Sequence, residues 1–161
     1  MSVKKVILGR VIGDILSQLE TAEKGRQFAV DESKAHKGAM QSRYDTFKEE
    51  AQYLAGAQNK QRQELARTLA DLKSLKNDPP KIVRGSSYAL IEVESCHDGR
   101  RTKYFLLPAG GGNTYEVGGE VITVLTLGSP IARALIGKVE DDEVDIRIQG
   151  AVKKLLIISV E

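Results

Sequence analysis

The sequence predicts an α+β protein: an N-terminal antiparallel α-helical coiled-coil hairpin followed by a C-terminal antiparallel β domain with one short helix. Three observations predict it. Apolar residues before residue 77 recur at helical spacing, with steps of four and three residues. Pro79 and Pro80 then stop the helical pattern, because proline lacks the backbone N–H that a helix interior needs. After them, glycine-rich turns separate short runs with the alternation typical of strands.

The composition predicts a soluble, folded chain of one or two small domains. It has 161 residues, of which 41% are hydrophobic and 29% charged. Its net charge of +2 is too near balance for a general nucleic-acid binder. No apolar run resembles a signal peptide or a membrane span, and one cysteine allows no disulfide within the chain. We therefore expect a cytoplasmic protein without a membrane partner.

The helical hairpin is expected over residues 1–80. Its second helix carries a heptad seam at Met40, Tyr44, Phe47, Ala51, Leu54, Gln58, Gln61, Leu65, Thr68, Leu72 and Leu75. Its first helix has a weaker stripe at Ile12, Ile15, Leu16, Leu19, Ala22, Ala29 and Val30. If Ile12 lies beside Leu75, the chain reverses near residue 43, so we expect the tip at residues 38–47.

The predicted tip would hold three carboxylates, Asp45, Glu49 and Glu50, at the end of a slender rod. Each arm of about 30 residues would be roughly 45 Å long at 1.5 Å per residue. Ser42 with Asp45, or Thr46 with Glu49, has the spacing of a capping box for the second helix. These acids either complement the helix dipole, as first-turn acids commonly do, or bind a hard divalent cation through their oxygens.

A short stretch beside these acids, residues 33–44, contains no acid and includes Lys34, His36, Lys37 and Arg43. A solvated charged face is the ordinary explanation. The alternative is a basic patch that attracts RNA phosphates. Tyr44 either packs on the seam or, because it is close to the reversal, stacks on a base.

The β domain is expected over residues 81–161, with strands near residues 86–95, 100–109, 120–127, 142–148 and 153–161. Asp98 and Gly99 are a strong hairpin turn signal between the first two strands. A short helix is expected after the third strand. Ser129 would cap it, Pro130 would take its first position and Gly137 would end it.

Other catalytic and metal sites are not favoured by the sequence. Neighbouring Cys96 and His97 would point to opposite faces of a strand and so would not pair as nucleophile and base. Residues 110–113, GGGN, lack the lysine and following helix of a phosphate-binding loop. The acidic residues 140–145 lack the spacing of a Ca²⁺ loop, and two distant histidines do not suggest zinc. We expect no cofactor of its own.

The stretch SPIARALIGKVEDDEVDIRI, residues 129–148, closely resembles the C-terminal domain of the bacterial Gre transcript-cleavage factors. The stretch KEEAQYLAG, residues 48–56, is similar to that family's tip sequence KENAEYHAA. The order of a helical hairpin and a β domain is also the same. The resemblance implies an FKBP-like fold for residues 81–161 and a divergent branch of the Gre family.

The resemblance also implies a function. In that family the hairpin enters the secondary channel of RNA polymerase, where tip acids help to hold the second catalytic Mg²⁺ and the polymerase cleaves backtracked RNA. The chain would then be no enzyme itself but would lend Asp45, Glu49 and Glu50 to the polymerase, with Asp45 and Glu49 at its Mg²⁺. Expected contacts to RNA or polymerase are Lys37, Arg43, Tyr44, Ser129, Pro130 and Arg133. The expected partners of this monomer are bacterial RNA polymerase and the nascent RNA 3′ end.

Two positions depart from the family's pattern. The family has an aspartate three residues before the glutamate matched by Glu49, whereas this chain has Thr46 there and Asp45 one residue earlier. A common acid before the SPIARAL run is Gly128 here. The alternative is therefore a cleavage-inactive regulator or inhibitor in the secondary channel. A peptidyl-prolyl isomerase or chaperone is disfavoured because few aromatics could line a proline pocket. Those after residue 80 are Tyr88, Tyr104, Phe105 and Tyr115.

Overall fold

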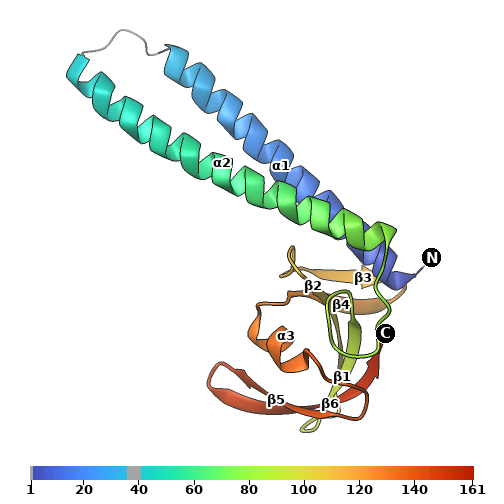
Figure 1. The fold of residues 1–161 in the computed structure, drawn as a ribbon. Helices are drawn as coiled ribbons and strands as arrows, with labels where there is room; N and C mark the ends of the chain where they lie inside the picture. Colours follow the sequence, from blue (N-terminus) through green and yellow to red (C-terminus); the bar gives the residue numbers. More distant parts are fainter. Residues whose placement is uncertain (1, 36–40) are drawn as a thin grey trace. The chain divides into compact units, whose positions relative to one another are not determined.

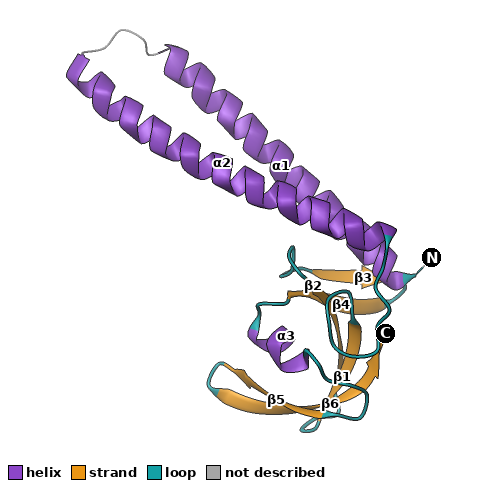
Figure 2. Cartoon of the chain, viewed as in Figure 1, coloured by secondary structure: helices purple, strands orange, loops and turns teal. Residues whose placement is uncertain are grey.

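The computed structural model describes the backbone of residues 2–35 and 41–161, and the side chains of residues 2–28, 48–50 and 52–161. Its helices and strands confirm the predicted α+β class (Figures 1 and 2). In chain order they are α1 (Val3–Ala35), α2 (Gln41–Asn77), β1 (Leu90–Ser95), β2 (Arg101–Leu107), β3 (Thr114–Val117), β4 (Glu120–Thr126), α3 (Pro130–Leu135), β5 (Glu143–Ile148) and β6 (Ala151–Val160).

Packing divides the chain into two compact units. The first contains Met1–Ile12 and Ala70–Glu161, and the second contains Gly13–Leu69. The first unit thus holds the whole β domain together with the beginning of α1 and the end of α2. The predicted domain boundary between residues 80 and 81 stays a prediction. The packing units do not divide the chain there, because both helix ends pack with the sheet.

The helix boundaries agree with the sequence at one end of α2 and differ at the other. α2 ends at Asn77, ahead of the two prolines, as predicted. It begins at Gln41, so Ser42 and Thr46 lie inside it. The predicted capping boxes are therefore wrong, because an N-cap residue stands outside the helical hydrogen-bond ladder.

α1 and α2 run antiparallel within the second unit. The guanidinium of Arg62 donates a hydrogen bond to the carboxylate of Glu23 and so connects the two helices. The predicted register places Glu23 opposite Glu64. The observed partner of Glu23 is Arg62, which is about half a helical turn from Glu64. The predicted seam is buried only in part: Leu72 is buried and Leu65 half-buried, but Leu54 is 59% exposed.

The strands form one sheet in the order β3-β4-β2-β1-β6-β5. All neighbouring pairs are antiparallel except β2 and β4, which are parallel, so the sheet is mostly antiparallel, in agreement with the predicted class. The parallel pair arises from β3, a strand of four residues that was not predicted from the sequence. It pairs with β4 as a hairpin, and β4 returns between β3 and β2.

The main core of the β domain lies between the sheet and α3, which covers one face in Figure 1. Its buried members are Ala89, Ile91, Val93, Leu106, Leu125, Ala132, Leu135, Val144, Ile146, Leu155 and Ile157. The approach of α3 is close. The amide of Gly85 donates to Lys138 O at 2.7 Å, and a Cβ on Gly85 would lie 1.9 Å from Leu135 O. Only glycine fits there without a shift of the backbone.

The opposite face of the sheet is also buried. Phe105 alternates with Leu106 along β2, so it points away from α3. It is fully buried, with its ring 5.4 Å from that of Tyr88 in an edge-on arrangement. Within the same unit, the ammonium of Lys4 lies 5.2 Å from the centre of the Tyr88 ring. Arg10 of α1 donates to Glu116 O on β3 at 2.7 Å, which fixes the first turns of α1 to this strand.

Candidate functional site

Two of the predicted acids lie exposed on the third turn of α2. Glu49 and Glu50 follow Gln41, the first residue of the helix, by eight and nine positions, and both are exposed. Asp45 belongs to the same helix, although its side chain lies outside the described residues. Residues four apart on a helix lie on one face, about 6 Å apart along its axis. The backbone therefore places Asp45 and Glu49 on one face of α2.

A shallow hollow surrounds these acids and is lined by Glu49, Glu50, Tyr53 and Leu54. Two i,i+4 pairs make it, Glu49 with Tyr53 and Glu50 with Leu54. Tyr53 is 80% exposed. The sequence pattern did not mark Tyr53 as a site residue, and it assigned Leu54 to the heptad seam. The available signal was their spacing of one turn from the acids.

The acids do not form a complete metal centre by themselves. Among the described residues, no three His, Cys, Asp or Glu side chains are placed to hold a metal ion together. Mg²⁺ requires near-octahedral coordination by oxygens. Two or three carboxylates on this helix can supply part of such a shell, and the remaining ligands would have to come from water, a phosphate or another protein.

The predicted RNA-contacting residues near the start of α2 are only partly described. Lys37 lies outside the described residues. Arg43 and Tyr44 lie in the first turn of α2, and their side chains lie outside the described residues too. Their roles stay predictions that follow from their place in the chain.

The predicted docking residues of the β domain lie together on α3. The hydroxyl of Ser129 accepts a hydrogen bond from the amide of Ala132 at 3.2 Å, so it caps the helix as predicted. Pro130 takes the first position and is exposed. Arg133 is exposed on the side away from the core, since Ala132 and Leu135 are the buried residues of this helix. Capping explains the Ser–Pro pair without a partner, whereas Arg133 forms no ion pair with another described residue.

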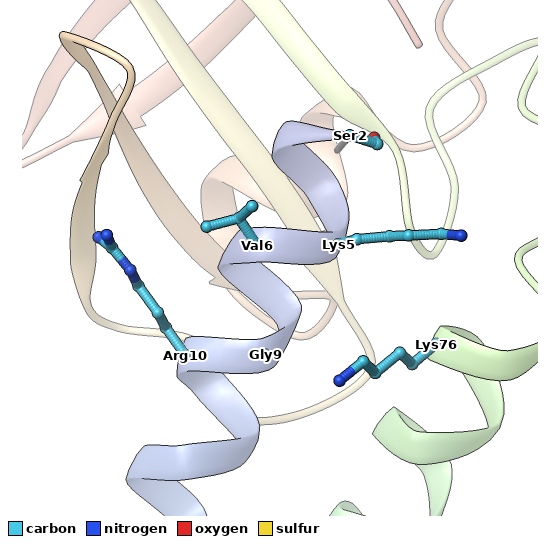
Figure 3. A pocket seen from close by; sticks show the side chains of 6 residues that line it. All are labelled: Ser2, Lys5, Val6, Gly9, Arg10 and Lys76. Carbon is cyan, nitrogen blue, oxygen red and sulfur yellow. The ribbon is translucent and has the colours of Figure 1, made fainter.

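A second hollow, which the sequence analysis did not anticipate, lies in the first unit beside α1 (Figure 3). Ser2, Lys5, Val6, Gly9, Arg10 and Lys76 line it. Its cations do not converge. Arg10 extends toward β3, whose carbonyl it binds, and Lys5 extends in another direction (Figure 3). A phosphate site needs donors aimed at one point, so this hollow is a basic surface rather than a built anion site.

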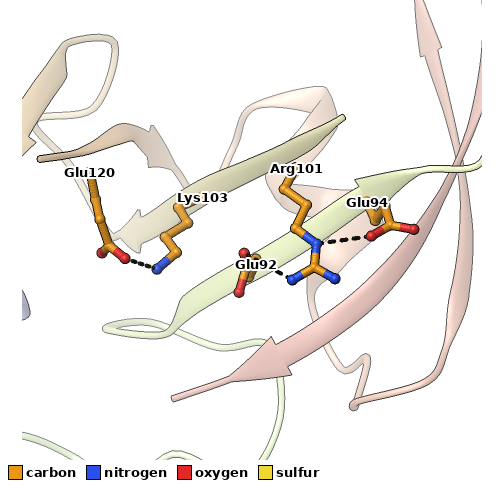
Figure 4. Close-up of polar contacts among 5 residues, drawn as sticks. All are labelled: Glu92, Glu94, Arg101, Lys103 and Glu120. Carbon is orange, nitrogen blue, oxygen red and sulfur yellow. Dashed lines mark hydrogen bonds and ion pairs between the residues drawn. The ribbon is translucent and has the colours of Figure 1, made fainter. Parts of the chain in front are cut away.

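A cluster of charges on β1, β2 and β4 is internally paired (Figure 4). Arg101 Nε lies 2.9 Å from Glu94 and Arg101 Nη1 lies 3.9 Å from Glu92. Lys103 Nζ lies 2.6 Å from Glu120, and this hydrogen bond raises the pKa of Lys103. Cross-strand pairs of this kind stabilise a sheet, so the cluster has a structural explanation and offers no free charge to a ligand.

The aromatic residues do not line a proline-binding pocket. Tyr88 and Phe105 are buried against each other, and Tyr104 is half-buried, where burial raises its pKa. This arrangement weakens the isomerase alternative. No helix in the described part of the chain is long and apolar enough to cross a membrane.

Comparison with known proteins identifies the family. No protein-family model matches the chain. Over 122 residues the chain is 31% identical to transcription elongation factor GreA of Syntrophus aciditrophicus, which covers 73% of this chain and 66% of that relative. The chain belongs to the Gre family of transcription elongation factors. It is a divergent Gre-family member and spans about two thirds of the relative's length.

Solved structures similar to this Gre-family chain include other members of the family. The transcription factor Gfh1 has a TM-score of 0.42 and 12% identity, covering 100% of this chain and 95% of its own. Gfh1 of Thermus thermophilus has a TM-score of 0.41 and 11% identity, with coverages of 93% and 94%. A GreA/GreB factor from Nitrosomonas europaea has a TM-score of 0.38 and 15% identity, with coverages of 60% and 78%.

Proposed function

We propose that this Gre-family chain binds the secondary channel of RNA polymerase and stimulates the polymerase's own cleavage of backtracked RNA. It would act in the cytoplasm as a monomer and without enzymatic activity of its own. The observation that carries the proposal is the exposure of Glu49 and Glu50 on α2, beside the backbone position of Asp45. Glu49 and Glu50 are held on a helix and form no hydrogen bond or ion pair with another described residue, so they are available to a metal in another protein.

The chemistry of the proposed step follows from the ligand preference of Mg²⁺. A second metal ion in phosphodiester cleavage stabilises the negative charge on the attacking and leaving oxygens. Asp45 and Glu49, on consecutive turns of one face, would donate carboxylate oxygens to this ion, and Glu50 would lie beside them. The polymerase would supply the other ligands, because the chain alone offers too few.

Two further groups of residues would position the factor. Ser129, Pro130 and Arg133 on α3 would contact the rim of the channel, with Arg133 exposed for an ion pair. Lys37, Arg43 and Tyr44 would lie near the nascent RNA 3′ end. The positive charge of Lys37 and Arg43 would offset the repulsion between the acids and the RNA phosphates.

RNA cleavage in stalled, backtracked complexes tests the proposal. The double variant Asp45→Ala/Glu49→Ala should lose stimulation on the order of a hundredfold, since it removes preorganised charges at the reacting centre. The matched control is Glu64→Ala/Asp71→Ala, which removes two exposed acids elsewhere on α2. Equal stimulation by the wild type and by the Asp45/Glu49 variant would exclude the acids from the mechanism.

The second candidate function is a secondary-channel regulator without cleavage. It is favoured by Thr46, which stands where the family's tip has an aspartate, and by Asp45 one residue earlier. This candidate expects the wild type to block a cleavage-competent Gre factor while cleaving nothing. It also expects Asp45→Thr/Thr46→Asp, which restores the family's spacing, to gain cleavage. Stimulation by the wild type would decide for the first candidate.

A further inference from the structure

The ring of Tyr53 is exposed beside the acids without a structural role among the described residues. At 80% exposure it is the most exposed of the large hydrophobic side chains that the structure describes. The aromatic contact in the described part of the chain joins Tyr88 and Phe105, and no hydrogen bond to a described residue involves Tyr53. It also lies off the predicted heptad seam. Core packing of the helical hairpin therefore does not explain it.

The position of Tyr53 continues the row of acids. Asp45, Glu49 and Tyr53 follow each other at steps of four residues on α2, so they occupy one face on three successive turns. Each step rises about 6 Å along the helix. Leu54, which is 59% exposed, widens the apolar floor of the hollow beside Glu50. The row on α2 therefore has carboxylates at one end, Asp45 and Glu49, and an aromatic ring at the other, Tyr53.

A nucleotide matches these two ends. Its phosphate is reached by carboxylates only through a metal ion, and its base has a flat face that stacks on an aromatic ring. Acids alone repel RNA, so an uncharged contact one turn away provides attraction that the acids cannot. A protein groove would also accept an exposed Tyr and Leu, but it would leave the adjoining row of carboxylates without a purpose.

We infer that Tyr53 stacks on the unpaired base at the 3′ end of backtracked RNA and so positions the RNA against the acids. The inference rests on the proposed function for the location of the hollow, and it adds a substrate contact that the acids do not provide. Tyr53 would be a positioning residue. Its effect would appear in the factor concentration required for half-maximal binding, rather than in the cleavage rate at saturation.

A double-variant cycle between protein and RNA tests the inference. Binding is measured by fluorescence anisotropy of the labelled full-length chain. Its partner is a polymerase complex backtracked by one nucleotide, with Ca²⁺ in place of Mg²⁺ to prevent cleavage. The RNA ends either in a normal purine nucleotide or in a nucleotide that lacks its base. Tyr53→Ala should weaken binding to the normal RNA on the order of tenfold. It should have no effect when the base is absent.

Matched variants separate stacking from general contact. Tyr53→Phe keeps the aromatic ring and should bind like the wild type. Tyr53→Leu lacks the ring and should bind like Tyr53→Ala. Phe28→Ala removes another aromatic of the second unit, 70% exposed on α1, and should leave binding unchanged. Asp45→Ala/Glu49→Ala should still bind the complex with normal RNA more tightly than the complex whose RNA lacks the terminal base, even where it abolishes cleavage.

The outcomes distinguish this inference from the proposed function. Base-dependent binding without cleavage would support stacking and refute the cleavage activity. Cleavage with an equal loss in Tyr53→Ala on both RNAs would refute stacking and assign Tyr53 to a polymerase groove. Cleavage with no loss in Tyr53→Ala would refute any role for the ring. Absence of wild-type binding to the complexes would refute both proposals.

Discussion

Apolar side chains of α1 and α2 are mostly buried in the first packing unit and mostly exposed in the second, where Ile15 is the buried exception among the described residues. In the first unit, Ile7, Leu8 and Leu72 have no exposed surface. In the second unit, Phe28, Tyr53 and Leu54 are more than half exposed, although they belong to the same α1 and α2. The predicted heptad seam of α2 includes both Leu54, in the second unit, and Leu72, in the first. Burial therefore depends on what lies opposite each residue and not on the periodicity alone.

This difference indicates that the first unit provides most of the apolar stabilisation, whereas the second unit presents exposed side chains for binding. Burial of a large aliphatic side chain contributes about 1.5–3 kcal/mol to folding, so the first unit holds the apolar stabilisation of the helix ends. Exposed aromatic and aliphatic side chains in the second unit contribute little to stability. In the proposed function, the surface of Tyr53 and Leu54 is available to RNA or polymerase instead.

The largest expected effect comes from comparing the same residue type in both units. Leu72→Ala should lower the free energy of unfolding by about 2–5 kcal/mol, because it leaves a cavity at a fully buried site. Leu54→Ala on the same helix should change it by at most about 0.5 kcal/mol, since the side chain is largely exposed. Urea unfolding followed by circular dichroism measures both. Equal destabilisation by the two variants would contradict the contrast between the units.

An intermediate effect is expected at the connection between α1 and β3. Arg10→Met keeps most of the aliphatic stem but removes the hydrogen bond to Glu116 O, and should cost about 1 kcal/mol. The control is Arg26→Met, an exposed arginine of α1 in the second unit, which should be nearly neutral. Hydrogen exchange of the β3 amides provides a local readout. Unchanged exchange at β3 in Arg10→Met would show that this contact does not hold the strand.

Local signals predicted much of the fold correctly. Pro79 and Pro80 marked the end of α2, and Ser129 with Pro130 marked α3, because caps and prolines act through the nearest backbone groups. The start of α2 was wrong since Ser and Thr also occur inside helices. β3 was missed because Thr114–Val117 is too short for a clear alternation, and its presence made the pairing of β2 with β4 parallel.

The sequence predicted the positions of the acids in the candidate site, but it did not predict the exposure of the side chains around them. The spacing of Asp45 and Glu49 on one face of a helix followed from the sequence alone. The exposure of Leu54 did not, since the heptad pattern assigned it to the seam. Gln58 and Gln61 interrupt this seam, and small Ala22 and Gly25 lie in the opposing segment of α1. That segment offers little apolar surface to the seam of α2 at Gln58 and Gln61, and burial along a seam depends on the partner helix as well as on the heptad pattern of α2.

The smallest expected effect concerns the ion pair that joins the helices in the second unit. Glu23 and Arg62 are each about half exposed, with side-chain accessibilities of 49% and 43%. Exposed pairs contribute roughly 0.2–1 kcal/mol. A double-mutant cycle with Glu23→Gln and Arg62→Met should give a coupling energy in this range, decreasing as salt is raised because the pair is screened.

The sign and size of this coupling would sharpen the comparison between the units. The second unit has few buried apolar contacts among its described residues, so the pair fixes the register of the helices more than it adds stability. The expected readout of register is a disulfide between cysteines introduced at Ala22 and Gln61, which should form more slowly in Arg62→Met than in the parent. A coupling well above 1 kcal/mol that persists at high salt would mean that the pair is shielded from water. The second unit would then be packed more like the first.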